Sequence, residues 1–232
     1  MADRFVWGSF DDSPIVLKAL EQSTGPLLEL GCGTGRALEV PLKKGYNVIG
    51  IDHSKDMLAV AKERFKTYNN LRLLLGDVTQ MQYPGFGTVA MLLNTYSVFT
   101  DAQVRLDILK RVAVSMNDSG NAVFILKNDN EAGRKSSTRE EVSEIEAGKK
   151  LHYQGAAEYD PRTGIRTLRL KFRFGDENEH HIIPTILFSV EQFAREAALA
   201  GLVVSELYGD FDLSPYHREQ SPWQIYLLTH QK

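Results

Sequence analysis

Short apolar strands alternate with helical segments between residues 26 and 126, and this order limits the possible folds more than any other feature of the chain. The expected strands are apolar on both faces and lie at 26–30, 46–52, 71–75, 89–93 and 122–126. Apolar residues recur at helical spacing between them, for example in the segment that Ser54 caps. Strands of this kind, alternating with helices, predict an α/β fold with a doubly wound parallel sheet covered on both sides.

The pattern changes after the fifth expected strand. Residues 128–150 are polar, and the segment 138–141 has the sequence of a capping box, which predicts a short helix. In residues 151–188, strict alternation of apolar and polar side chains predicts a three-stranded antiparallel meander. The apolar face of this meander must be covered by the rest of the chain or by a second subunit. Its residues are Leu168, Leu170, Phe172 and Phe174.

The last segments return to the first pattern, with a helix expected at 190–199 and strands at 202–208 and 223–229. A meander of about 38 residues holds too little core to fold alone. The sequence therefore predicts a single domain over residues 1–232, in which residues 128–188 form an inserted antiparallel subdomain on the substrate side.

Aromatic residues precede the first expected helix. Phe5, Trp7 and Phe10 come before Ser13 and Pro14, a pair that is typical of a helix start. We expect this segment to fold over a bound ligand as a lid, and simple aromatic packing explains the same residues equally well.

Composition excludes several classes of protein. The formal charge of −3 lacks the basic excess that nucleic-acid binding usually requires. Cys32 is the single cysteine, which excludes an intramolecular disulfide and a thiolate zinc site. The apolar runs are far shorter than the roughly 18–20 residues of a membrane span, and residues 1–4 do not begin a signal peptide. We therefore expect a soluble, cytoplasmic protein that binds neither nucleic acid nor membrane.

A glycine-rich loop follows the first expected strand. In the segment 29–36, Glu-Leu-Gly-Cys-Gly-Thr-Gly-Arg, the glycines allow the backbone to approach a ligand and the next helix offers free N–H groups. Arg36 stands where the G-x-G-x-x-G pattern of dinucleotide sites has its third glycine. Asp52 and Asp77 end the second and third strands, so Glu29, Asp52 and Asp77 meet at one edge of the sheet, where such folds bind ligands.

With these motifs in order, the sequence resembles the class I S-adenosylmethionine-dependent methyltransferases, over Leu27 to Leu126 and again from Val190 onward. The resemblance implies a Rossmann-like seven-stranded sheet with the last strand antiparallel. It also implies S-adenosylmethionine as cofactor and S-adenosylhomocysteine as product, without a metal. A Pro-Gly turn usual before the fifth strand is replaced here by 118–120, Asp-Ser-Gly, which alters a turn and not the cofactor pocket.

The resemblance also assigns roles to residues. The glycine loop lies under the methionine part of the cofactor, Asp52 holds the ribose, His53 packs on the adenine and Asp77 accepts from the adenine amine. The full set of expected cofactor-binding residues is Glu29, Gly31, Cys32, Gly33, Gly35, Asp52, His53, Met57, Asp77, Val78 and Asn94.

The acceptor is expected to be a small molecule methylated on nitrogen or oxygen. Residues 94–96, Asn-Thr-Tyr, lack the Asn/Asp-Pro-Pro-aromatic motif of the enzymes that methylate nucleic-acid bases and protein amides. His217 is the preferred general base because imidazole titrates near neutral pH. His181 and His180 follow as candidates, and Tyr96 could position the substrate. The inserted meander resembles the roof of small-molecule N- and O-methyltransferases and could also form a homodimer.

Two other functions remain open at this point. The chain could be a non-catalytic, methyltransferase-like protein that keeps the cofactor pocket. It could also be an NAD(P)-binding oxidoreductase, although Arg36 and the separate Asp77 argue against this class.

Overall fold

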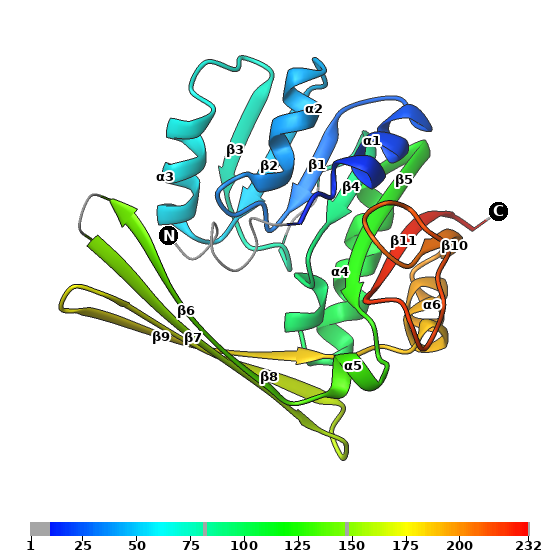
Figure 1. Ribbon diagram of the computed structural model, residues 1–232. Coiled ribbons are helices and arrows are strands. Elements are labelled where there is room, and N and C mark those ends of the chain that lie inside the picture. The colour runs from blue at the N-terminus through cyan, green and yellow to red at the C-terminus, as the bar shows by residue number, and fades with distance from the viewer. Residues whose placement is uncertain (1–9, 81–82, 147–148, 232) are drawn as a thin grey trace.

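The computed structural model describes residues 10–80, 83–146 and 149–231. Seven strands form one sheet in the order β10-β11-β5-β4-β1-β2-β3 (Figure 1). β1 to β5 are parallel to one another, and β11 is antiparallel to both β5 and β10. The predicted seven-stranded Rossmann-like sheet with its last strand antiparallel is therefore confirmed. Its strands are β1 (Leu27–Leu30), β2 (Val48–Asp52), β3 (Leu71–Leu75), β4 (Phe86–Met91), β5 (Met116–Lys127), β10 (Leu202–Tyr208) and β11 (Trp223–His230).

Helices cover both faces of this sheet (Figure 1). Leu27, Val123 and Ile225 belong to the apolar cluster on one face, and the neighbouring residues Leu28 and Phe124 belong to the cluster on the other. This alternation explains why the strands are apolar on both sides. The first face is packed by α1 (Ser13–Glu21), η2 (Arg36–Leu38), α2 (Glu39–Lys43) and α3 (Lys55–Arg64), and the second by η3 (Tyr96–Val98), α4 (Ala102–Ser115) and α6 (Val190–Leu199).

A second sheet has four antiparallel strands in the order β6-β7-β8-β9 and extends below the first sheet as a long arm (Figure 1). The predicted meander is thus present, but the prediction of three strands starting at residue 151 was wrong. Its strands are β6 (Ser137–Glu146), β7 (Lys149–Asp160), β8 (Ile165–Phe174) and β9 (Glu177–Ile186), and α5 (Glu131–Arg134) precedes them.

The short helix predicted from the capping box at 138–141 was also wrong, because these residues lie in β6. A capping box stabilises a helix only where an apolar face follows to pack it. Here Ser137 instead pairs with Ala157 of β7 at the start of a long ladder. β6 is an edge strand, and its charged residues are the kind that protect a free edge from pairing with another chain.

The inserted segment that forms the four-stranded sheet leaves the core and returns to it at one place. The backbones of Asn128 and Phe188 form a β-bridge there. The buried Asn128 side chain donates to the carbonyls of Arg218 and Ser221 at 2.7 and 2.8 Å and accepts from Gln224 at 2.7 Å. This single residue therefore ties the inserted sheet to the loop between β10 and β11.

One face of the arm turns toward the core. Leu170 and Phe172 form a small cluster with Leu151, and each of the two is 6% exposed. The apolar face of β8 is therefore covered within the chain, and a homodimer through the meander stays a prediction. Among the described helices, none has the length and apolar composition to cross a membrane.

Candidate functional site

A cavity of about 580 Å³ lies at the carboxyl ends of the parallel strands, between them and the inner face of β8 and β9. Its size is typical of sites for small molecules and cofactors. It includes every predicted cofactor-binding residue except Gly35. The lining residues are Glu29, Gly31, Cys32, Gly33, Arg36, Asp52, His53, Met57, Gly76, Asp77, Val78, Leu92, Leu93, Asn94, Thr95, Val98, Phe99, Leu168, Ile183 and Thr185.

Two glycines of the loop after β1 have left-handed backbones that leave no space for a side chain. Gly31 has φ of 76°, and a Cβ atom there would lie 2.6 Å from Cγ2 of Thr95. Gly35 has φ of 81°, and a Cβ atom there would lie 2.5 Å from the Phe65 ring. Gly31 therefore shapes the cavity, whereas Gly35 allows the loop to pack on α3 and does not line the cavity.

Asp52, at the end of β2, holds this loop in place. Its Oδ2 accepts from the backbone N–H of Gly33 at 2.8 Å, and its Oδ1 accepts from that of Ser54 at 2.8 Å. The side chain is buried, yet it lines the cavity. Each carboxylate oxygen accepts two hydrogen bonds, so Asp52 can also accept from the hydroxyls of a bound sugar. His53 follows, with an exposed ring whose Nδ1 lies 3.6 Å from Oδ1 of Asp52.

Asp77, after β3, is kept ionised by its neighbours. Its Oδ1 accepts from the backbone N–H and the hydroxyl of Thr79, both at 2.8 Å, and these two hydrogen bonds lower the pKa of the Asp77 carboxyl. Glu29, Asp52 and Asp77 thus place three acidic side chains along this part of the cavity. The arrangement favours a ligand with hydroxyl or amine donors and positive charge.

The segment after β4 has an unusual backbone. Leu93 and Asn94 have φ of 42° and 65°, conformations that non-glycine residues rarely adopt. Asn94 is fixed there because its N–H donates to the Ile125 carbonyl at 2.8 Å and its Oδ1 accepts from the Lys127 N–H at 2.6 Å. Consecutive positive φ angles of this kind gather at functional sites, and both residues line the cavity.

Cys32 is buried beside the cavity. Burial raises the pKa of its thiol well above the ordinary value, and the charges of Glu29 and Asp52 raise it further. The thiol therefore stays protonated at neutral pH, which argues against a nucleophilic role.

The three predicted catalytic side chains do not line the cavity. Tyr96 is fully buried and its hydroxyl donates to Oε2 of Glu196 at 2.8 Å, so it packs in the core. His217 is exposed in the loop between β10 and β11, and its backbone N–H donates to Ser221. His181 lies on the inner face of the edge strand β9, half exposed, with Nε2 3.5 Å from Glu179. Their catalytic roles stay predictions that this placement does not support.

Sequence reasoning missed two groups of lining residues. Arg36, noted only as a departure from the dinucleotide pattern, lines the cavity, with its guanidinium paired to Asp12 at 2.6 Å and donating to the Phe10 carbonyl at 3.1 Å. Leu168, Ile183 and Thr185 close the cavity from the arm. Arg36 could have been found from its place after the glycine loop, whereas the arm residues carry no local signal. Phe5 and Trp7 of the predicted lid lie outside the described residues.

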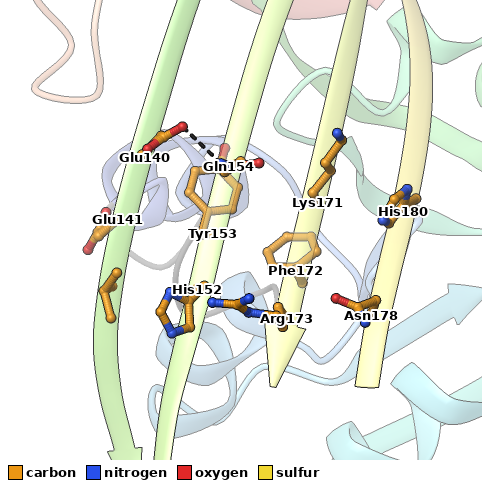
Figure 2. A pocket seen from close by; sticks show the side chains of 11 residues that line it. Glu140, Glu141, His152, Tyr153, Gln154, Lys171, Phe172, Arg173, Asn178 and His180 are labelled. Carbon is orange, nitrogen blue, oxygen red and sulfur yellow. Dashed lines mark hydrogen bonds between the residues drawn. The ribbon is translucent and has the colours of Figure 1, made fainter. Parts of the chain in front are cut away.

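A second depression, of about 270 Å³, lies mainly on the opposite face of the four-stranded sheet (Figure 2). Its polar side chains come from adjacent strands, for example His152 of β7, Lys171 of β8 and His180 of β9. Side chains alternate along β8, so Lys171 faces away from the side on which Leu168 closes the first cavity. His180, the third histidine candidate, therefore points away from the larger cavity.

Part of the chain is similar to known proteins in sequence. Residues 27–120 match the profile of a family described as a methyltransferase domain. An uncharacterized methyltransferase of Bacillus cytotoxicus is 30% identical over 112 residues, which cover 47% of this chain and 50% of that protein. The chain thus spans about half the length of this curated relative.

Solved structures extend the likeness to the whole fold. An S-adenosylmethionine-dependent methyltransferase of Clostridium acetobutylicum has a TM-score of 0.84 at 16% identity and covers 100% of this chain and 96% of that one. CalS10 of Micromonospora echinaspora is an amino pentose methyltransferase solved with S-adenosylmethionine bound. It has a TM-score of 0.72 at 16% identity, and the match covers 94% of this chain and 88% of CalS10. The arm is therefore part of a fold that these methyltransferases share.

Proposed function

We propose that this chain is a class I S-adenosylmethionine-dependent methyltransferase that transfers a methyl group to a nitrogen or oxygen of a small molecule. The match of residues 27–120 to a methyltransferase domain and the fold shared with S-adenosylmethionine-dependent methyltransferases support this proposal. The observation that carries the proposal is the cavity, in which the glycine loop and three acidic side chains converge. Bound there, S-adenosylmethionine supplies an electrophilic methyl group on a positively charged sulfur.

The residues present fit this cofactor. Asp52 has free acceptor capacity for the two ribose hydroxyls, and Asp77 is an ionised acceptor for the adenine amine. Glu29 lies at the loop, where its negative charge favours a sulfonium or an ammonium group. Arg36 lines the same cavity and is the cation placed to bind the methionine carboxylate.

Methyl transfer by in-line displacement needs placement more than acid–base chemistry. Alignment of two reactants can lower a barrier by roughly 7–11 kcal/mol. Here Asn94 and Thr95 are held by backbone and side-chain hydrogen bonds, and Leu168 and Ile183 add apolar lining from the arm. Among the histidines of the described chain, His53 alone lines the cavity, on the cofactor side. We therefore infer that the acceptor reaches the site with its lone pair available, without a histidine base.

The acceptor is a small molecule in this proposal, because the arm closes the cavity that cofactor and acceptor must share. Nitrogen is the favoured nucleophile because CalS10, with the same arm and fold, is an amino pentose methyltransferase. An amine can attack without a base once it is neutral, which suits the lining of the cavity.

Calorimetric titration with S-adenosylhomocysteine, and in parallel with NADH, tests the cofactor. We expect binding of S-adenosylhomocysteine and none of NADH. Binding of NADH alone would instead support the oxidoreductase alternative.

Incorporation of labelled methyl groups across a panel of small amines and alcohols tests turnover. A protein that binds S-adenosylhomocysteine but methylates no member of the panel would favour the non-catalytic alternative. The Asp56→Asn variant is a suitable control for both experiments, since Asp56 is exposed on α3 and does not line the cavity.

A further inference from the structure

Two cationic residues, Lys127 and Arg166, are neighbours of lining residues of the cavity, on β5 and β8 and not on the strands β1 to β3 that the acidic residues end. Lys127 ends β5, and its backbone N–H donates to Asn94, which lines the cavity. Arg166 is directly opposite Thr185 in the β8–β9 ladder and lies two residues before Leu168. Its side chain is therefore on the same face of the sheet as the side chains of Thr185 and Leu168. Thr185 and Leu168 both line the cavity, which places Arg166 at its rim.

Arg166 has no partner for its charge among residues 10–80, 83–146 and 149–231. Its Nε is buried, and its guanidinium forms no hydrogen bond or ion pair within the described residues. Burial lowers the pKa of this side chain, since water is removed from the charge without compensation. An arginine that serves only the fold is normally paired when it is buried, because an unpaired buried cation is costly.

Lys127 is also without an ion-pair partner in the described chain, and its Nζ lies over the Trp223 ring at 4.9 Å from the centroid. Burial lowers the pKa of its ammonium, and the nearby charge of Arg166 lowers it further. Asp210 opposes this effect and is the carboxylate that acts on Lys127. Lys127 is thus influenced by one other cation, Arg166, and by one carboxylate, Asp210.

We propose that Lys127 and Arg166 bind an anionic group of the methyl acceptor, either a carboxylate or a phosphate ester. The inference rests on the proposed methyl transfer, and it adds the substrate class. A planar guanidinium offers paired donors to either anion, and the lysine adds a compact charge beside it. Asp52 and Asp77 at the cofactor end repel an anion, so the acceptor is oriented with its anion toward β8 and its nucleophile toward the methyl group.

Matched acceptor pairs test this proposal in turnover. Each amine is offered once with its anion and once without it: an amino acid and its amide, and an amino sugar phosphate and the free amino sugar. We expect removal of the anion to lower kcat/KM at least about 10-fold, as for loss of a charged hydrogen bond. The two kinds of pair also show whether carboxylate or phosphate is preferred. Equal use of charged and neutral members would overturn the proposal.

Variants assign the effect to the two cations. Arg166→Gln and Lys127→Met should each reduce the preference for the charged member about 10-fold or more, with S-adenosylhomocysteine affinity unchanged. Arg169→Gln is the matched control, since Arg169 lies on the same strand but faces the other side, near Glu158. If Arg166→Gln weakened S-adenosylhomocysteine binding about 10-fold, the anion would be that of the cofactor and the proposal would be wrong.

A binding experiment keeps the proposal testable if no acceptor in the panel is methylated. Trp7 and Trp223 are the two tryptophans, so in a Trp7→Phe variant the fluorescence reports on the ring beside Lys127. With S-adenosylhomocysteine bound, benzoate or phenyl phosphate should change this emission and benzyl alcohol should not. No response to either anion would overturn the proposal. Failure to bind S-adenosylhomocysteine would instead overturn the proposed function. In that case the same anions are titrated against the protein alone.

Discussion

Arg105 is buried and Arg166 is partly buried, and the two guanidinium groups differ in their partners. Arg105, on α4, is 2% exposed and forms a two-pronged ion pair with Glu196, with Nη2 to Oε1 at 2.7 Å and Nε to Oε2 at 3.1 Å. Its Nη1 donates to the carbonyls of Phe99 and Thr100. Arg166, at the rim of the cavity, has none of these contacts within the described residues.

The difference indicates that the charge of Arg105 stabilises the fold, whereas the charge of Arg166 is available to bind a ligand. Arg105 ties α4 to α6 and to the segment after η3, where Phe99 lines the cavity. Each of its three guanidinium nitrogens has an internal acceptor. Within the part of the chain that the structure describes, the donors of Arg166 have no acceptor, so a bound anion would supply an interaction there.

The largest expected effect is on stability at the paired site. Arg105→Met should lower the free energy of unfolding by about 3–5 kcal/mol, because it leaves the partly buried Glu196 carboxylate without its cation and with only the hydrogen bond from Tyr96. Urea denaturation measures the change, and Arg195→Met, on the exposed side of α6, is the control. A loss below about 1 kcal/mol would mean that Arg105 is not the structural charge that its contacts indicate.

Asp52 combines both kinds of role, since it has internal partners and also faces the cavity. Asp52→Asn should weaken S-adenosylhomocysteine binding by about 1.5–3 kcal/mol, because an amide replaces one acceptor oxygen by a donor. Calorimetry of the variant beside Asp56→Asn measures this. Unchanged affinity would show that the assignment of Asp52 to the ribose is wrong.

Tyr96 belongs to the paired site through its hydrogen bond to Glu196. Tyr96→Phe should cost about 1–2 kcal/mol of stability, since Glu196 keeps its pairing to Arg105, and kcat should not change. Parallel unfolding and turnover measurements separate the two effects. A large fall in kcat with intact stability would restore Tyr96 as a catalytic residue.

The smallest expected effect is at the unpaired site. Arg166→Met should change the free energy of unfolding by less than about 1 kcal/mol, or raise it, because no side-chain hydrogen bond to the described residues is lost and a partly buried charge is removed. Thermal unfolding without added anions measures this. A loss of about 3 kcal/mol, comparable to that at Arg105, would remove the contrast between the two sites.

The parallel sheet and the cofactor half of the site could be predicted because their signals are local. The glycine loop, Asp52 and Asp77 each stand directly after a strand, and parallel strands bring their carboxyl ends to one edge. Ten of the eleven expected cofactor residues line the cavity for this reason. The other, Gly35, packs against the Phe65 ring on the side of the loop away from the cavity.

The acceptor half could not be predicted, because it depends on how the arm folds back. Leu168, Ile183 and Thr185 have the pattern of any half-buried strand, and nothing local shows which face meets the cavity. The histidines were chosen for their titration range alone, and the fold places His217 in an exposed loop. β6 was missed because its charged residues have weak strand propensity and gain their structure from pairing with β7.

The bridge between Asn128 and Phe188 has an evolutionary consequence. Because the chain leaves the core and returns to it at adjacent residues, the segment between them can change in length or sequence while the strands around the bridge keep their positions. A short turn would suffice to close the gap. Natural variation can therefore exchange one acceptor-binding module for another on a constant cofactor-binding frame, and chimaeras cut at this bridge are the natural route to engineering a new acceptor.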